Sequence, residues 1–287
     1  MNFGRILTAM ITPFNEEGQV DYERMTELIN HLIENNTDGL VVTGTTGESV
    51  VLSEEETEAI YEHVVRIVDK RIPVLAGTGS NDTKKTIALT KKATAYGVDG
   101  IMLVSPYYNR PNQAGLYEHF KAVANETELP VMLYNIPGRT GVHIDAETII
   151  RLAEIENIVA VKEASGDLEQ VAEIIANTDD NFTVYSGDDS MTLPMMAIGA
   201  RGVVSVASHI IGNEMKAMID NFLQGEIDKA AQLHRKLLPI MNGLFMTPSP
   251  APLKAALRLK GLDVGSVRLP LVDLTEEELK TLKQILF

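Results

Sequence analysis

The chain contains no cysteine, and its basic residues are scarce. Without cysteine there are no disulfide bonds, no thiolate nucleophile and no cysteine-ligated metal. Only 25 Lys and Arg stand against 40 Asp and Glu, which gives a net charge of −15. A negative field of this size repels nucleic acids and anionic membrane surfaces. We therefore expect neither of them as a partner.

Long hydrophobic runs are also missing. No apolar stretch approaches the roughly 20 residues that a membrane-spanning helix needs. The first ten residues, MNFGRILTAM, lack the charged, then apolar, then small order of a secretory signal. These features predict a cytoplasmic protein.

Several catalytic and metal-binding motifs are absent as well. There is no HExxH and no GxSxG, and GTTGES at 44–49 lacks the lysine that completes a phosphate-binding loop. The six histidines are scattered singly, without the spacing of metal ligands. We expect no metal site, and nucleotide binding is disfavoured.

Short apolar runs recur along the first two thirds of the chain. There are eight of them: RILTAMI, GLVVTG, IPVLAG, GIMLVS, PVMLYN, IVAVKEAS, FTVYSG and GVVSVAS. Continuous apolar runs are typical of strands covered on both faces, hence of a parallel sheet. The segments between them have helical spacing, and LSEEET at 52–57 is a capping-box helix start. Eight such units predict an α/β fold, a closed (β/α)₈ TIM barrel, with a doubly wound open sheet as the alternative.

The strand pattern stops after Gly225, and only helical patterns follow. The last of these begins at Thr275, with Glu278 completing a second capping box. The segment MTPSPAP at 246–252 is a rigid connector because it holds three prolines. We expect a catalytic barrel over residues 1–225 and a C-terminal helical extension over residues 226–287.

Polar residues gather where the predicted strands end. GTTGES follows the second strand, SPYYNRP (105–111) the fourth, YNIPGRTG (134–141) the fifth and SGDD (186–189) the seventh. The carboxyl ends of the strands form the active-site face of a (β/α)₈ barrel. We therefore expect these segments to meet at one mouth.

Lys162 lies within the apolar strand IVAVKEAS and shares a face with Ala160 and Ala164. A buried lysine is usually either paired with an acid or kept for its amine. Burial lowers the pKa of an amine and so supplies the free base that attacks a carbonyl to form a Schiff base. Its place on a late barrel strand favours this interpretation, and Tyr134 on the neighbouring strand would move the protons.

Two further segments have the chemistry to hold carboxylates. The glycines and hydroxyls of GTTGES form a cradle for an anion. Arg139, between Gly138 and Thr140, has a guanidinium fork that fits a substrate carboxylate, although an exposed surface arginine is the simpler alternative.

GTTGES, SPYYNRP, YNIPGRTG and AVKEASGD, in this order and spacing, resemble the dihydrodipicolinate synthase family of pyruvate-dependent class I aldolases and lyases. The resemblance covers essentially the whole chain. It implies a TIM barrel with a helical C-terminal part, a homotetramer built as a dimer of dimers, and a Schiff base between pyruvate and Lys162.

The resemblance also implies roles for single residues. Catalytic roles fall to Lys162, to Tyr134 and Thr45 as proton relay, and to Tyr108, which is expected to reach across a subunit interface. Substrate-binding roles fall to Thr46, Arg139, Gly187 and Val204.

The implied activity is a lyase that condenses pyruvate with L-aspartate 4-semialdehyde in the diaminopimelate route of lysine biosynthesis, without a cofactor. Arg139, within GRTG, supports the assignment of L-aspartate 4-semialdehyde as the second substrate. Sister enzymes such as N-acetylneuraminate lyase and keto-deoxy-sugar aldolases share the lysine and tyrosine but tend to carry GSTGE and another residue after YNIP. These sisters remain the alternative, and a non-catalytic binding protein on the same scaffold is a third possibility.

Lysine-inhibited members of the family carry a histidine where Glu54 stands and an acid where Lys85 stands. A cation at Lys85 repels the ammonium of an incoming lysine. We predict that L-lysine inhibits this enzyme weakly or not at all. Potent inhibition in an initial-rate titration would contradict this.

Overall fold

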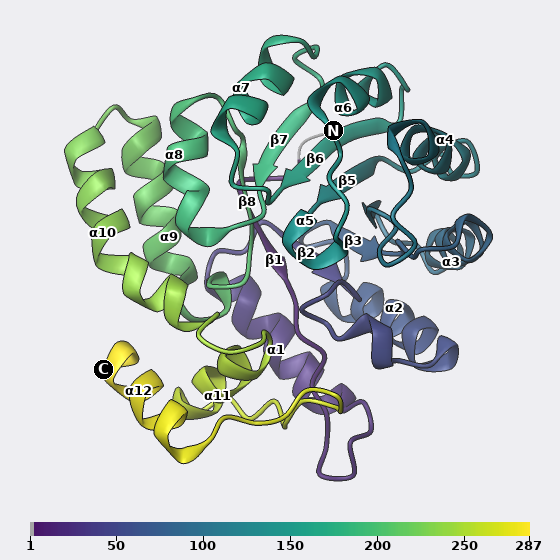
Figure 1. Ribbon diagram of the computed structural model, residues 1–287. Coiled ribbons are helices and arrows are strands. Elements are labelled where there is room, and N and C mark those ends of the chain that lie inside the picture. The colour runs from purple at the N-terminus through teal and green to yellow at the C-terminus, as the bar shows by residue number, and fades with distance from the viewer. Residues whose placement is uncertain (1–2) are drawn as a thin grey trace.

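The computed structural model describes residues 3–287, and in this range eight parallel strands close into a barrel (Figure 1). The strands are β1 (Ile6–Ala9), β2 (Gly39–Val42), β3 (Val74–Gly77), β4 (Gly100–Val104), β5 (Val131–Asn135), β6 (Ile158–Glu163), β7 (Thr183–Ser186) and β8 (Gly202–Ser205). Neighbours in sequence are neighbours in space, and β8 pairs with β1 to close the ring. The predicted closed barrel is therefore confirmed, and the open sheet is excluded.

Helices surround the barrel (Figure 1). They are α1 (Tyr22–Glu34), α2 (Glu54–Val68), α3 (Thr83–Ala95), α4 (Gln113–Ala124), α6 (Ala146–Ala153), α7 (Leu168–Ala176), α8 (Thr192–Ala197) and α9 (Ser208–Leu223). Short elements η1 (Ser49–Val51), α5 (Pro137–Thr140) and η2 (Asp189–Met191) lie in the loops that follow β2, β5 and β7. None of the helices within residues 3–287 is both long and apolar enough to cross a bilayer.

Two hydrophobic clusters account for the stability of this arrangement. One lies between the barrel and its helices, and in α1 it takes up Met25, Leu28 and Leu32, which recur at helical spacing. The other fills the barrel with inward-facing side chains. Its members include Leu7, Val41, Leu75, Met102, Met132, Ala160, Tyr185 and Val204. The barrel is thus a packed core, and in such barrels the active site lies at the carboxyl-terminal mouth.

The C-terminal helices follow the barrel directly. They are α10 (Ile227–Gly243), α11 (Ala251–Leu259) and α12 (Glu276–Leu286). Both predicted capping boxes are present, at Ser53 with Glu56 and at Thr275 with Glu278. Helix α10 packs beside α9, and the chain from α11 to α12 passes across α1 (Figure 1).

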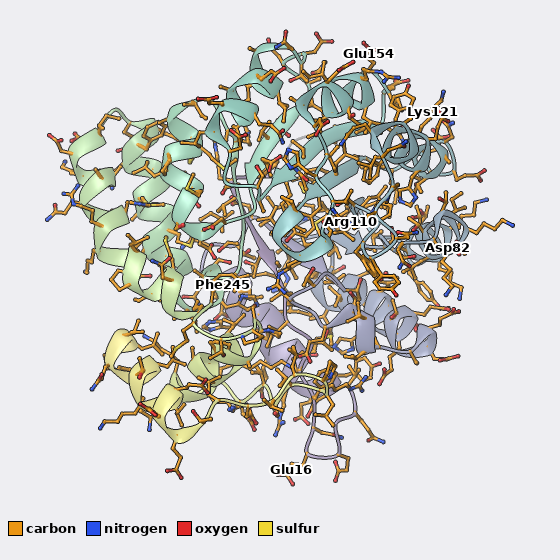
Figure 2. All side chains as sticks on the ribbon, viewed as in Figure 1. Glu16, Asp82, Arg110, Lys121, Glu154 and Phe245 are labelled. Atoms are coloured by element: carbon orange, nitrogen blue, oxygen red, sulfur yellow. The ribbon has the colours of Figure 1, made fainter. Side chains whose placement is uncertain are left out.

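Charged side chains cover the outer helical surface (Figure 2). Lys121 on α4 and Glu154 at the end of α6 project away from the barrel, whereas Arg110 lies beside α5. The Arg110 side chain approaches Gly141, which directly follows α5. The loop after β4 and the loop after β5 therefore lie together at the mouth.

Candidate active site

Lys162 lies near the carboxyl end of β6 and points into the barrel. Its backbone is in register with Tyr134 on β5 and Tyr185 on β7, and the residue is only 4% exposed. Its Nζ lies 4.1 Å from the centre of the Tyr134 ring. Within residues 3–287 no carboxylate forms an ion pair with it, in contrast to buried Lys254, whose Nζ lies 2.6 Å from Glu48. The alternative of a lysine paired with an acid therefore does not hold for Lys162.

Burial lowers the pKa of the Lys162 ammonium to about 7. The nearby negative charge of Asp189 raises this pKa, and the positive charge of Arg139 lowers it, but loss of hydration is the largest effect. At neutral pH a large fraction of the side chain is therefore the free amine. A free amine is the form that attacks a ketone.

This pKa predicts the pH dependence of amine reactivity. With a pKa of about 7, the free-amine fraction rises from about one-tenth at pH 6 to about nine-tenths at pH 8. The rate of borohydride trapping with limiting pyruvate is expected to rise about tenfold over this interval and then level off. A rate that still climbs tenfold per unit above pH 8 would show that the lysine keeps an ordinary pKa.

Tyr134 supplies a hydroxyl next to the amine. It is the penultimate residue of β5 and is 5% exposed, and burial raises the pKa of its phenol to about 12, against an opposing effect of Arg139. The phenol therefore keeps its proton at neutral pH. In this form the hydroxyl both donates and accepts a hydrogen bond, as a proton relay requires.

Gly187 borders Lys162 on the β7 side. A Cβ at this glycine would lie 3.1 Å from Cγ and Cε of Lys162 and 2.7 Å from Cβ of Ala164. Its N–H donates to the Glu163 carbonyl at 2.7 Å, so the main chain cannot move away. Any side chain here would displace the lysine, which explains glycine at this position.

Asp189 is a residue that the sequence analysis did not assign to the site. It accepts hydrogen bonds from Ser205 Oγ at 2.5 Å and from the N–H groups of Val206 and Ala207 at 3.1 and 2.9 Å. Burial raises the pKa of its carboxyl, while these three donors lower it. Its neighbour Asp188 caps η2 through Ser190 N–H. Asp188 thus caps a turn, and Asp189 ties the loop after β7 to the end of β8.

The outer face of β6 carries a second buried acid, Glu163. Its carboxylate accepts hydrogen bonds from Asn135 at 2.9 Å, from Gln170 at 3.0 Å and from Ser165 N–H at 2.6 Å. His143 in turn contacts Gln170 Oε1 at 2.8 Å. This network joins β5, β6 and α7 and fixes the two strands that hold Tyr134 and Lys162.

A cavity of about 320 Å³ opens at the mouth. Its wall includes Thr45, Tyr107, Tyr134 and Arg139. The Arg139 side chain is exposed on α5, where it can meet an incoming anion. The structure therefore brings Thr45, Tyr134 and Arg139 together in the cavity wall, and the Lys162 Nζ lies 4.1 Å from the centre of the Tyr134 ring.

Five of the eight predicted site residues are not in the wall of this cavity: Lys162 and Gly187, described above, and Thr46, Val204 and Tyr108. Thr46 and Val204 are buried, at 8% and 1% exposure, and Val204 belongs to the cluster inside the barrel. Tyr108 is 89% exposed, with a left-handed φ of 72°. Its hydroxyl is not part of the site formed by this chain alone.

Metal ligands do not converge anywhere in the part of the chain that the structure describes, residues 3–287. No group of three or more His, Cys, Asp or Glu side chains is placed to hold an ion. The chemistry open to this site is that of an amine, a phenol and a guanidinium.

Comparison with known proteins agrees with the fold and with the motifs at the mouth. The family model described as the dihydrodipicolinate synthetase family matches residues 2–287. The chain belongs to this family. The curated 4-hydroxy-tetrahydrodipicolinate synthase of Bacillus subtilis is 61% identical over 97% of this chain and 96% of its own length.

Solved structures of the family superpose closely. A dihydrodipicolinate synthase from Bacillus anthracis has a TM-score of 0.99 and 59% identity, covering 100% of this chain and 98% of its own. The chloride-inhibited enzyme from Acinetobacter baumannii, in complex with pyruvate, has a TM-score of 0.96 and 40% identity, covering 99% and 98%. The family relationship thus extends over the barrel and the C-terminal helices alike.

Proposed function

We propose that the protein is a lyase that condenses pyruvate with L-aspartate 4-semialdehyde to 4-hydroxy-tetrahydrodipicolinate, in the diaminopimelate route to lysine. The observation that carries the proposal is Lys162: an amine that is buried, has no ion-pair partner among residues 3–287, and has its pKa lowered to about 7. Relatives about 60% identical over nearly their whole length are named for this activity.

The reaction begins at the Lys162 amine. It adds to the ketone carbon of pyruvate, and loss of water gives the imine. Tyr134 is proposed to carry the protons of this step together with Thr45; the 4.1 Å from Lys162 Nζ to the Tyr134 ring centre and the shared cavity wall of Tyr134 and Thr45 support this. Loss of a methyl proton converts the imine to an enamine, whose terminal carbon attacks the aldehyde of the second substrate.

The second substrate is held by its carboxylate. Arg139 stands exposed at the mouth, and its guanidinium matches a carboxylate with two parallel hydrogen bonds. After the new carbon–carbon bond forms, the substrate's own amine attacks the imine carbon and expels the Lys162 amine. The ring closes, and the enzyme is regenerated without a cofactor.

The remaining residues support pyruvate binding. Thr46 is proposed to hold the pyruvate carboxylate, and Gly187 and Val204 to shape the pocket around Lys162. The close approach of Gly187 to Lys162 supports its part in this.

Self-association completes the proposed enzyme. We propose a cytoplasmic homotetramer, a dimer of dimers, in which Tyr108 enters the partner's site. The 89% exposure of Tyr108 and its left-handed backbone support this, because no hydrogen bond or ring contact from residues 3–287 holds the side chain. A fully active monomer in analytical ultracentrifugation would contradict it.

The substrate assignment is tested with a panel of aldehydes. Pyruvate-dependent turnover is measured with aspartate semialdehyde, N-acetylmannosamine and glyceraldehyde. We expect turnover with aspartate semialdehyde alone, and Arg139→Met is expected to lower kcat/KM for it by about 10²-fold because a charge-assisted contact is lost.

Two results separate the alternatives. A preference for a sugar aldehyde would keep the imine chemistry but assign the protein to a sister lyase or aldolase. Arg110→Met is the matched control, because Arg110 lies beside α5 but is not part of the cavity wall. Its kcat/KM for aspartate semialdehyde is expected to stay near that of the wild type.

A further inference from the structure

Glu48, the acid of GTTGES, is buried and is held by residues near the C-terminal end of the chain. It is 3% exposed and adopts a left-handed conformation, with φ of 55°. Its Oε1 lies 2.6 Å from the Lys254 ammonium on α11, and its Oε2 accepts from the N–H of Arg268 at 2.9 Å. Both partners lie more than 200 residues along the chain, so local sequence does not explain them.

Lys254 and the segment that leads to Arg268 are closely packed against the rest of the chain. Lys254 is 0% exposed, donates to the Ser266 carbonyl at 2.8 Å, and lies 4.1 Å from the centre of the Phe14 ring. The segment between them also fits closely: Gly265 has a φ of 71°, and a Cβ there would overlap the Phe14 carbonyl. We call Glu48, Lys254 and Arg268 the Glu48 clamp.

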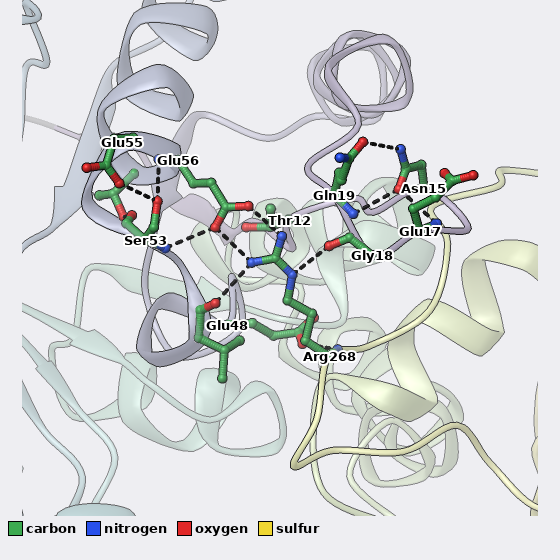
Figure 3. A network of polar contacts seen from close by, with 12 residues as sticks. Thr12, Asn15, Glu17, Gly18, Gln19, Glu48, Ser53, Glu55, Glu56 and Arg268 are labelled. Carbon is green, nitrogen blue, oxygen red and sulfur yellow. Dashed lines mark hydrogen bonds and ion pairs between the residues drawn. The ribbon is translucent and has the colours of Figure 1, made fainter.

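Arg268 extends the clamp to the start of α2. Its guanidinium contacts the Glu56 carboxylate at 2.5 and 2.8 Å and donates to the Gly18 carbonyl at 2.8 Å (Figure 3). It also donates to the Val51 carbonyl at 3.0 Å. Glu56 also closes the capping box with Ser53. The C-terminal segment therefore grips both ends of the 48–56 stretch.

The clamp acts on the loop that carries the proposed substrate contacts. Glu48 N–H donates to the Thr45 carbonyl at 3.0 Å, and Ser49 N–H to the Gly44 carbonyl at 3.4 Å. Thr12 Oγ1 donates to the Gly47 carbonyl at 2.7 Å. Thr45 lines the cavity beside Tyr134. Because the turn bond joins Glu48 directly to Thr45, a shift of Glu48 moves Thr45 and the intervening Thr46.

We infer that Glu48 is a positioning residue whose capture by Lys254 and Arg268 fixes Thr45 and Thr46 for pyruvate. The inference rests on the proposed function, since it concerns the same site. In this arrangement the C-terminal segment supports substrate binding through Glu48, although none of its residues contacts the substrate. Neither Lys254 nor Arg268 is in the cavity wall.

The test begins with Glu48→Gln, which keeps the shape of the side chain and removes its charge. The Lys254 ammonium is then left buried without a counter-charge. We expect kcat/KM for pyruvate to fall about 10- to 100-fold, which is the size of effect that a misplaced binding group produces. The KM for pyruvate is expected to rise several-fold more than the KM for aspartate semialdehyde.

A second variant keeps the test decisive if Glu48→Gln does not fold. Glu48→Gln/Lys254→Met removes both buried charges, and it should recover stability relative to Glu48→Gln alone. It should nevertheless keep the raised KM for pyruvate, because the loop is still released. Recovery of the wild-type KM in the double variant would overturn the inference.

Loss of stability alone is controlled with Leu282→Ala. Leu282 is buried on α12, which packs against α10 and α11, so this variant lowers the melting temperature and should leave the KM for pyruvate unchanged. If Leu282→Ala raises this KM as much as Glu48→Gln does, the role of Glu48 is only structural. A wild-type KM in Glu48→Gln would likewise sink the inference.

Borohydride trapping separates this inference from the proposed function. Wild-type protein that forms no pyruvate adduct at Lys162 would refute the proposed function. Wild-type protein that does form it, with Glu48→Gln needing no more pyruvate for half-maximal trapping, would refute the positioning role alone.

Discussion

Lys162→Ala is expected to lower turnover by about 10³-fold or more and to abolish the pyruvate adduct trapped by borohydride. The reason is that the variant lacks the amine that is proposed to form the covalent intermediate. Neither Tyr134 nor Arg139 replaces an amine. The adduct is measured by mass spectrometry of the intact protein and of its peptides, and turnover by a coupled assay.

Two controls make this result interpretable. Lys216→Ala removes a half-exposed lysine on α9 that pairs with Asp220 and is not part of the cavity wall. This variant should keep both the pyruvate adduct and the turnover. The second control is the conservative substitution Lys162→Arg, which keeps a positive charge at this position but cannot form the imine. An adduct of normal yield in Lys162→Ala would show that another amine reacts with pyruvate.

Tyr134→Phe is expected to lower kcat by about 10²- to 10⁴-fold, the range over which a positioned acid–base group contributes. The ring remains and still packs 4.1 Å from the lysine Nζ, so the change removes only the hydroxyl. Slower imine formation should account for much of the loss. Single-turnover trapping with pyruvate measures this step separately from the later condensation.

The barrel offers a matched control for this variant. Tyr185 is in register with Lys162 on the other neighbouring strand and is equally buried. Its hydroxyl donates to the Gly4 carbonyl at 3.0 Å, near the amino-terminal end of the barrel. Tyr185→Phe is expected to cost about 1 kcal/mol of stability and leave kcat nearly unchanged. Equal losses in the two variants would indicate a general packing effect and contradict a proton relay.

The barrel could be predicted from the sequence because the patterns that indicate its strands and helices are local. Eight apolar runs separated by helical spacing predict eight covered strands, and strand alternation predicts that Lys162 points inward. Both capping boxes were equally readable, since Ser53 and Glu56 are only three residues apart. Each of these patterns depends on neighbours within a single element.

The missed features depend on distant partners instead. Asp189 is bound by residues 16 to 18 positions later, and Glu48 by residues more than 200 positions later. Nothing in SGDD distinguishes the acid that caps a turn from the acid that enters the core. The separation of Thr45 and Thr46, one in the cavity wall and one buried, is likewise decided by how the loop is held.

The two buried lysines of this fold share several physical properties. The ammonium groups of Lys162 and Lys254 each lie 4.1 Å from an aromatic ring centre, and burial lowers the pKa of both, to about 7 and about 8. A carboxylate in contact with Lys254 makes it a fixed cation that fastens the chain, whereas Lys162 is left free to share its lone pair. Desolvation alone therefore does not create a nucleophile. In this chain, the contact with Glu48 makes Lys254 a structural residue, and the lack of such a contact among the described residues leaves Lys162 a reactive base.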